Sequence, residues 1–127
     1  MQHMECRGKS RKSEIWHYGY LCWDDSLPNG DGWMIRTTQG VYFAVDRETI
    51  GQWTGRKDCN GVKLFAGDRF NWIDWPGTYT ARWDDDFMAW HADTDTGGVS
   101  PLAKFFTPYA QPQIIIVGNI YNQITQP

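Results

Sequence analysis

Cysteine and histidine side chains are the groups in this chain best suited to chemistry. The 127 residues include Cys6, Cys22 and Cys59, together with His17 and His91 in aromatic segments. A thiol nucleophile needs a histidine base, and no local signature of such an enzyme surrounds any of the cysteines. Their spacing also lacks the C-x-x-C pairs of a zinc site. We therefore expect structural histidines, mostly buried reduced thiols and no catalytic residues.

Three consecutive aspartates, Asp84 to Asp86, form the densest acidic cluster. Adjacent carboxylates on one turn seldom converge on a cation, so a solvated turn is expected there, with no metal. The chain carries no phosphate-binding loop, dinucleotide fingerprint or zinc-protease helix. The sequence thus predicts that the protein is not an enzyme and has neither a cofactor nor a small-molecule substrate.

Short extended segments separated by turn residues must position these groups. Residues 15–23 and 41–45 are β-branched and aromatic, which is typical of strands, and turn residues fill 24–32. Apolar side chains alternate along 68–92 and predict a three-stranded antiparallel meander, with tight turns at Pro76-Gly77 and 84–86. We expect a loop over 93–101, one helical turn over 102–106 and a final strand over 114–124 with a bulge at Gly118.

The composition agrees with a turn-rich β protein. Aspartate outnumbers glutamate 12 to 3, and 20 aromatic residues provide much of the apolar material. The pattern predicts one mainly β domain over 1–127, either a small, SH3-like barrel or two packed sheets. Strands over 1–45 would precede a barrel-like part over 46–127.

The charge and hydropathy patterns limit which partners and which cellular compartment are expected. The formal charge of −3 argues against a globally basic nucleic-acid binder, although Arg7, Lys9, Arg11 and Lys12 form a basic stretch that is either a solvated loop or a contact patch. No apolar run has the length of a membrane helix, and residues 1–12 do not resemble a signal peptide. An odd number of cysteines does not suit a disulfide framework, so we expect a reducing cytoplasm and no membrane partner.

The stretch from Val45 to Phe70 reads VDRETIGQWTGRKDCNGVKLFAGDRF. It resembles the hallmark of the YopX family of phage and prophage proteins, V-D-x-x-T-hydrophobic-G-Q-aromatic-T-G-x-x-D-x-N-G-x-x-hydrophobic-aromatic-x-G-D. The matching residues are Val45, Asp46, Thr49, Gly51, Gln52, Trp53, Thr54, Gly55, Asp58, Asn60, Gly61, Phe65, Gly67 and Asp68.

Two flanking segments extend the resemblance from about residue 5 to about residue 122. Residues 6–9 and 16–21 resemble the family's F-R-G-K and W-x-Y-G-x-L opening, with Cys6 where an aromatic is usual. Residues 117–121, which include Gly118 and Asn119, resemble its closing strand. The resemblance implies a phage-encoded, mostly β protein of the host bacterial cytoplasm, without an established activity and without catalytic residues to transfer.

The motif residues also suit structural roles. Asn60-Gly61 is a tight-turn signal, and the Asp58 side chain can accept a hydrogen bond from the backbone two residues on. Gly67-Asp68 would begin the meander, with Asp68 satisfying amides of its own turn. The alternative is that residues 52–58 form a surface for a ligand or partner.

Two functions from different classes are compatible with the sequence. Eight tryptophans are hard to bury fully in a chain of this size, and exposed aromatics mark interfaces. The sequence therefore favours an accessory protein that contacts proteins, either itself or a phage or host protein. The alternative is a nucleic-acid-binding barrel in which cations contact phosphates and aromatics stack on bases. The candidate contact surface comprises Arg7, Lys9, Arg56, Lys57, Trp72, Trp75 and Trp90.

Overall fold

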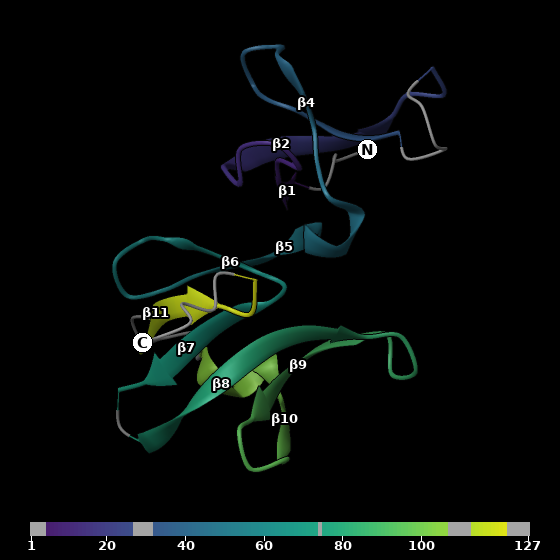
Figure 1. Cartoon of the computed structure of the whole chain (residues 1–127). Helices are drawn as coiled ribbons and strands as arrows, with labels where there is room; N and C mark the ends of the chain where they lie inside the picture. Colours follow the sequence, from purple (N-terminus) through teal and green to yellow (C-terminus); the bar gives the residue numbers. More distant parts are fainter. Residues whose placement is uncertain (1–4, 27–31, 74, 107–112, 122–127) are drawn as a thin grey trace, which may run out of the picture. The chain divides into compact units, whose positions relative to one another are not determined.

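The computed structural model describes residues 5–26, 32–73, 75–106 and 113–121 (Figure 1). These residues form eleven β-strands and two 3-10 turns, which confirms the mainly β prediction. The chain divides into two compact units, Met1–Trp53 and Thr54–Pro127, where the sequence suggested one domain subdivided after residue 45. No helix in the described part of the chain is long and apolar enough to cross a membrane.

Unit 1 is an antiparallel sheet. Its strands are β1 (Glu5–Lys9), β2 (Trp16–Trp23), β3 (Trp33–Arg36), β4 (Tyr42–Ala44) and the first part of β5 (Gly51–Lys57), in the order β4-β3-β2-β1-β5. The core of this unit lies on one face, where Cys6, Ile35 and Val45 are buried and Trp33 and Ile50 pack against them. The predicted strands at 15–23 and 41–45 are therefore confirmed.

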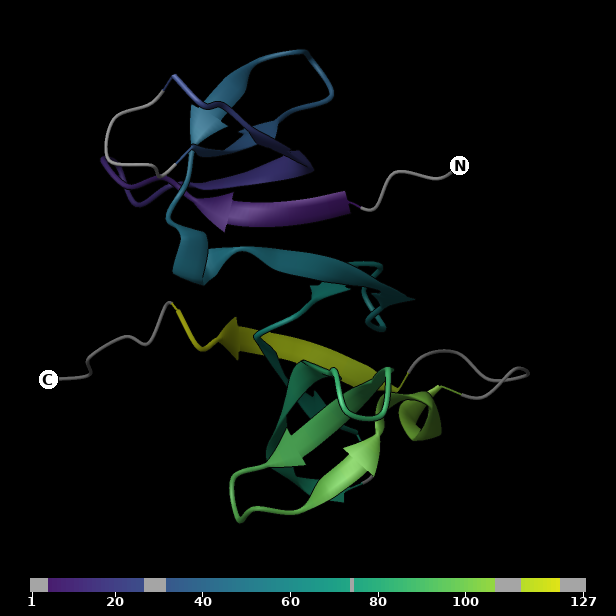
Figure 2. The ribbon, with the colours of Figure 1, turned by 90° about the vertical axis from the view of Figure 1, so that its right-hand side faces the viewer.

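Unit 2 contains the predicted meander and more (Figure 2). Its five-stranded antiparallel sheet has the order β10-β9-β8-β7-β11, and β6 lies beside β5. These strands are β6 (Lys63–Phe65), β7 (Asp68–Trp72), β8 (Trp75–Asp84), β9 (Ala89–Thr94), β10 (Val99–Pro101) and β11 (Ile114–Asn119). The 3-10 turn η3 (Leu102–Phe105) confirms the predicted helical turn.

An aromatic core stabilises unit 2. Phe70 is fully buried, and its ring centroid lies 5.3 Å from that of Phe105 and 5.6 Å from that of Tyr79. Leu64 and Ile114 are also fully buried in this cluster. The η3 turn therefore contributes Phe105 to the packing of β7 and β8, which large rings dominate as the composition suggested.

Several boundaries differ from the prediction. Pro76-Gly77 lies inside β8 and not at a turn, because the chain reverses earlier and Trp72 pairs with Trp75. Residues 99–101 form β10 where a loop was expected. The last strand ends at Asn119, and residues 122–124 of its predicted range lie outside the described residues, as do residues 27–31 of the predicted turn. The predicted bulge is confirmed by the register shift between Ile116 and Gly118.

The sheets are open, so the mainly β prediction is confirmed but the strands do not close into the barrel that was one of its two alternatives. In unit 2, β10 and β11 end the strand order and are not paired with each other. β10 has three residues and ends at Pro101, which has no amide hydrogen for a further ladder bond. A short strand that ends in proline is a common way to terminate a sheet.

Candidate functional site

The carboxylate of Asp58 binds three backbone amides. It is buried, and its Oδ1 accepts hydrogen bonds from the backbone amides of Asn60 and Val62, each at 2.9 Å. Its Oδ2 accepts from the backbone amide of Ile116 at 3.1 Å. The expected turn at residues 58–62 is therefore confirmed, and the same carboxylate also binds β11.

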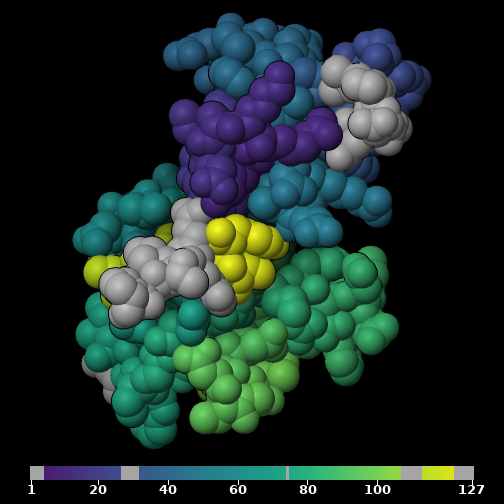
Figure 3. Space-filling model, in the orientation of Figure 1, coloured from purple at the N-terminus to yellow at the C-terminus, as the bar shows by residue number. Residues whose placement is uncertain are grey.

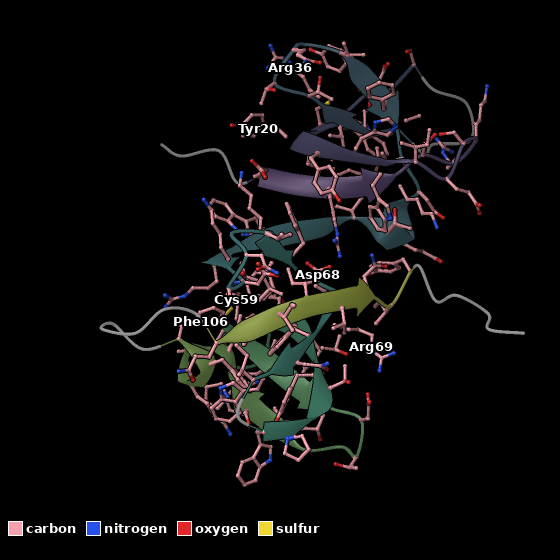
Figure 4. All side chains as sticks on the ribbon, turned by 90° about the vertical axis from the view of Figure 1, so that its left-hand side faces the viewer. Tyr20, Arg36, Cys59, Asp68, Arg69 and Phe106 are labelled. Carbon is pink, nitrogen blue, oxygen red and sulfur yellow. The ribbon has the colours of Figure 1, made fainter. Side chains whose placement is uncertain are left out.

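Gly67 and Asp68 form a second structural node of the motif (Figure 4). Asp68 is buried and its Oδ2 accepts a hydrogen bond from the Phe65 amide at 2.7 Å, as predicted for a turn that begins the meander. The Gly67 amide donates to the Ala81 carbonyl at 2.9 Å, and its own carbonyl accepts from Ile120 at 3.0 Å. Its φ of +89° explains why glycine suits this position.

The beginning of the motif has the same character in unit 1. Asp46 caps the 3-10 turn η2 (Arg47–Thr49), because its side chain accepts from the Glu48 amide at 3.2 Å. The Thr49 hydroxyl accepts from the Lys9 amide at 2.9 Å and donates to the Asp46 carbonyl at 2.7 Å. The motif thus holds η2 against β1.

The remaining motif residues complete the turns and strand pairings. The Thr54 hydroxyl donates to the Leu64 carbonyl at 2.8 Å and joins β5 to β6. The Asn119 side chain accepts from the Tyr121 amide at 2.8 Å. Gly51 and Gln52 pair with β1, while Gly55, Gly61 and Gly118 adopt positive φ. These contacts give the motif a structural role.

The two basic residues of β1 differ in exposure. Arg7 is buried, with its guanidinium 4.7 Å from the centroid of the Trp16 ring, so it offers little surface for the contact role predicted for it. β1 lies inside the sheet between β2 and β5, and the Trp16 ring on β2 packs against the Arg7 guanidinium. Lys9 is half-buried, and its Nζ lies 6.0 Å from the same ring.

The basic residues of β5 are exposed as expected. The Arg56 guanidinium lies 5.1 Å from the centroid of the Phe106 ring, and the neighbouring Lys57 also lies at the surface. Cation–ring contact of this kind favours one orientation of the arginine but leaves its charge accessible. Figure 4 labels Phe106 in this part of unit 2.

The tryptophans match the expectation of incomplete burial, since all eight are at least partly exposed. Trp75 has an exposed fraction of 62%. Trp72 and Trp90 are half-buried and pack against the core of unit 2. The three tryptophans therefore differ in exposure, and their exposed fractions do not identify them as a single surface patch.

The β8–β9 hairpin presents a more distinct surface (Figure 3). Trp83 and Trp90 pair across the two strands with their ring centroids 5.4 Å apart. Beyond them, Phe87 and Met88 are 72% and 73% exposed. Met88 has a φ of +52°, a conformation that glycine or asparagine usually provides. We call Phe87 and Met88 the hairpin tip.

Ion pairs hold the other face of this hairpin. Arg82 contacts Asp93 through Nε at 2.6 Å and through Nη2 at 3.1 Å, which raises the arginine pKa. Asp84 Oδ2 lies 3.4 Å from Arg82 Nη1 and 3.0 Å from His91 Nδ1. Burial raises the pKa of Asp84, but hydrogen bonds from the backbone of residues 86 and 87, together with these two partners, lower it overall.

A further surface, absent from the sequence-based predictions, lies on the face of the unit 1 sheet opposite its core. The β-pairings place Tyr18 opposite Arg7, Tyr20 opposite Arg36, and Arg36 opposite Tyr42. Directly paired side chains share a face, so these residues lie opposite the buried core. Figure 4 shows Tyr20 and Arg36 on the same side of unit 1. The W-x-Y-x-Y alternation at 16–20 was the signal available in the sequence. We call this surface the tyrosine face.

One end of the tyrosine face borders a hollow. It has a volume of about 540 Å³ and is lined by Cys22, Trp23, Asp24, Met34 and Tyr42. The Asp24 Oδ1 accepts from the amide and hydroxyl of Ser26, and these bonds lower the aspartate pKa. The hollow therefore combines aromatic walls with an ionised carboxylate.

The cysteines and histidines do not share one environment. Cys6 is buried, and burial together with Glu5 raises its thiol pKa, whereas Cys59 is exposed, contrary to the expectation of mostly buried thiols. His17 stacks on Phe43 with the ring centroids 3.7 Å apart. In residues 5–26, 32–73, 75–106 and 113–121, no three His, Cys, Asp or Glu side chains are grouped to hold a metal ion.

A scan against models of known protein families finds no match, and a search of curated proteins finds no significant relative. The fold and surfaces therefore define the chain as an all-β protein of two units, with a structural motif, an apolar hairpin tip and a tyrosine face.

Proposed function

We propose that this protein is a non-enzymatic phage accessory protein that acts through protein contacts, with the hairpin tip as its contact element. The observation that carries the proposal is the pair Phe87 and Met88, which expose 72% and 73% of their surfaces at the end of a well-packed hairpin. Large apolar side chains at the centre of an interface contribute much of its binding energy.

The backbone of Met88 strengthens this interpretation. A non-glycine residue at positive φ costs about 1–2 kcal/mol relative to ordinary backbone, and Met88 lies at +52°. Strained residues concentrate where a particular side chain is used. Methionine also adapts its shape to different partner surfaces. A contact role explains why a strained position carries a large flexible side chain.

The charge around the tip indicates the partner's chemistry. Asp84, Asp85 and Asp86 precede Phe87, and hydrogen bonds plus the Arg82 charge favour the ionised form of Asp84. An apolar centre with an acidic rim is complementary to an apolar pocket surrounded by basic groups. The same acidic rim disfavours an anionic membrane surface as the partner.

The phage origin and bacterial cytoplasm are part of the same proposal. The resemblance of the 45–70 segment to the YopX family supports a phage-encoded protein in a host cell. Three cysteines without a disulfide in the described residues are compatible with a reducing compartment.

Sedimentation velocity over a range of concentrations and capture from phage-infected cells test the contact role. The double variant Phe87→Ser with Met88→Gly removes the apolar tip, and Val99→Ser is the matched control because Val99 is 57% exposed on β10. We expect self-association or a captured protein that the double variant loses and the control retains. A protein that stays monomeric and captures the same proteins with either variant would contradict the proposal.

A further inference from the structure

The tyrosine face has the composition of a stacking surface. The pairings align Trp16, Tyr18 and Tyr20 of β2 with cations on both neighbouring strands, Lys9 and Arg7 on β1 and Arg36 on β3. Side chains two residues apart on one strand face the same way and are about 6.8 Å apart. The face is therefore a row of aromatic rings flanked by positive charge.

Its rings are accessible from solvent. Tyr18 is 47% exposed and Tyr42 is 54% exposed, while Trp16 and Tyr20 are half-buried beside them. The buried residues of unit 1, such as Ile35 and Val45, lie on the opposite side of the sheet. The exposed parts of the Tyr18 and Tyr42 rings can therefore be reached by a planar ligand.

The local charge differs in sign from that of the whole chain. On this face and in the adjoining hollow, the described residues provide three cations, Arg7, Lys9 and Arg36, and two carboxylates, Glu5 and Asp24. The Arg7 guanidinium, at 4.7 Å from the Trp16 ring, supplies positive charge even though it is buried. The chain carries −3 overall, so this face is a basic region on an acidic protein.

We propose that the tyrosine face binds single-stranded nucleic acid, with bases stacked on Tyr18, Tyr20 and Tyr42 and phosphates beside Arg36 and Lys9. This role is separate from the protein contacts of the hairpin tip. Stacking on aromatic rings needs bases whose faces are open, so a duplex is a poor ligand. The hollow beside Tyr42, at about 540 Å³, continues the face with a concavity in the size range of ligand sites; because Asp24 lines it, it suits a base and not a phosphate.

Fluorescence anisotropy at low salt tests the proposal on the full chain. The probes are labelled single-stranded DNA and RNA of about 12 nucleotides and a duplex of the same length, which suits the usual site size. We expect the single strands to bind more tightly than the duplex. Tyr18→Leu and Tyr42→Leu should each weaken binding about tenfold, while Tyr18→Phe and Tyr42→Phe, which keep the ring, should retain it.

Charge is tested separately from stacking. Arg36→Gln should reduce the slope of log affinity against log salt by about 0.7. The matched controls lie in unit 2, where Trp75→Leu removes an exposed ring and Arg56→Gln removes an exposed cation. Neither control should change binding, and the hairpin-tip double variant should also bind normally.

Three results would overturn the proposal. One is the absence of binding to any single strand at low salt. Another is equal loss of binding in Tyr42→Leu and Trp75→Leu, which would indicate non-specific contact. The third is displacement of the single strand by an acidic peptide of equal charge at equal concentration, which would assign the face to an acidic protein segment. Circular dichroism of each variant confirms that it is folded.

Discussion

The side chain of Asp58 binds the backbone of Ile116 across 58 positions of sequence, with 3.1 Å between Oδ2 and the amide nitrogen. The neighbouring Cys59 amide donates to the Ile114 carbonyl at 2.9 Å. Together these bonds satisfy polar backbone groups along the outer side of β11, which would otherwise be an open sheet edge. The central and closing segments of the motif therefore meet in space.

Replacing Asp58 should destabilise unit 2 strongly. Asp58→Ala leaves three backbone amides without the carboxylate that they bind, and each unsatisfied buried group costs about 1–3 kcal/mol. We expect the free energy of unfolding to fall by about 3 kcal/mol in urea titrations. Asp86→Ala removes an exposed carboxylate and should change it by less than about 0.5 kcal/mol. Equal effects of the two substitutions would disprove the bridging role.

Gly67 tests the second contact between the central and closing segments. A Cβ at this position would lie 2.7 Å from Cε2 of Tyr121, in addition to the cost of its φ of +89°. Gly97 has a φ of +94° with open space around it, so Gly97→Ala measures the backbone cost alone. We expect Gly67→Ala to be more destabilising than Gly97→Ala by about 1 kcal/mol. Tyr121→Ala should abolish that difference, and its persistence would mean that the ring is not responsible.

Met88→Gly should make the protein more stable. Glycine adopts a φ of +52° without the strain that methionine incurs, so the free energy of unfolding should rise by about 0.5–1 kcal/mol. Thermal unfolding followed by circular dichroism measures the change. Phe87→Gly, at the neighbouring position, should bring no such gain because Phe87 does not have a positive φ. A lower melting temperature for Met88→Gly would show that the position is not strained.

Acid should destabilise unit 1 through His17. Burial lowers the pKa of this histidine from 6.5, so the unfolded chain takes up the proton before the folded chain does. Stability should therefore fall as the pH falls through 6.5 towards the lower folded pKa. Urea titrations at about pH 7.5 and about pH 5.5 bracket the interval. His17→Phe keeps a ring on Phe43 and should lose less stability between these two pH values. An unchanged loss of stability would assign the pH dependence to other groups.

Local sequence patterns predict the strands and turns of the hairpins well because these elements depend on residues that are close in sequence. Apolar residues at every second position, Phe70 and Trp72 on β7 and Tyr79 and Ala81 on β8, correctly predict which side of each strand faces the core. Asp58 and Asp68 were assigned to turns for reasons of side-chain chemistry that the hydrogen bonds confirm. In these cases the residues that decide the structure lie within a few positions of one another.

The elements that sequence patterns missed depend on distant partners. β1 carries the basic side chains Arg7 and Lys9, so its sequence indicates a solvated stretch. In the structure the strand lies between β2 and β5, Arg7 is buried and Lys9 is half-buried. The Asp58 link to Ile116 and the alignment of Tyr20 with Arg36 likewise follow from strand order. Strand order is a property of the whole fold and has no local signature, which is why the tyrosine face emerged only from the pairings.

The position of β11 has a consequence for how the protein is made on the ribosome. The pairings within unit 1 join residues between Glu5 and Gln52, so they can form while the rest of the chain is still being synthesised. In contrast, β7 cannot pair with β11 until Ile114 has been synthesised, and Asp58 cannot bind its third amide until Ile116 has been added. At about 5–20 residues per second, synthesis from Trp72 to Ile114 takes roughly 2–8 s. During it, the nascent β7 has an unpaired edge exposed to other chains in the cell, a period in which a chaperone or a second nascent chain can bind.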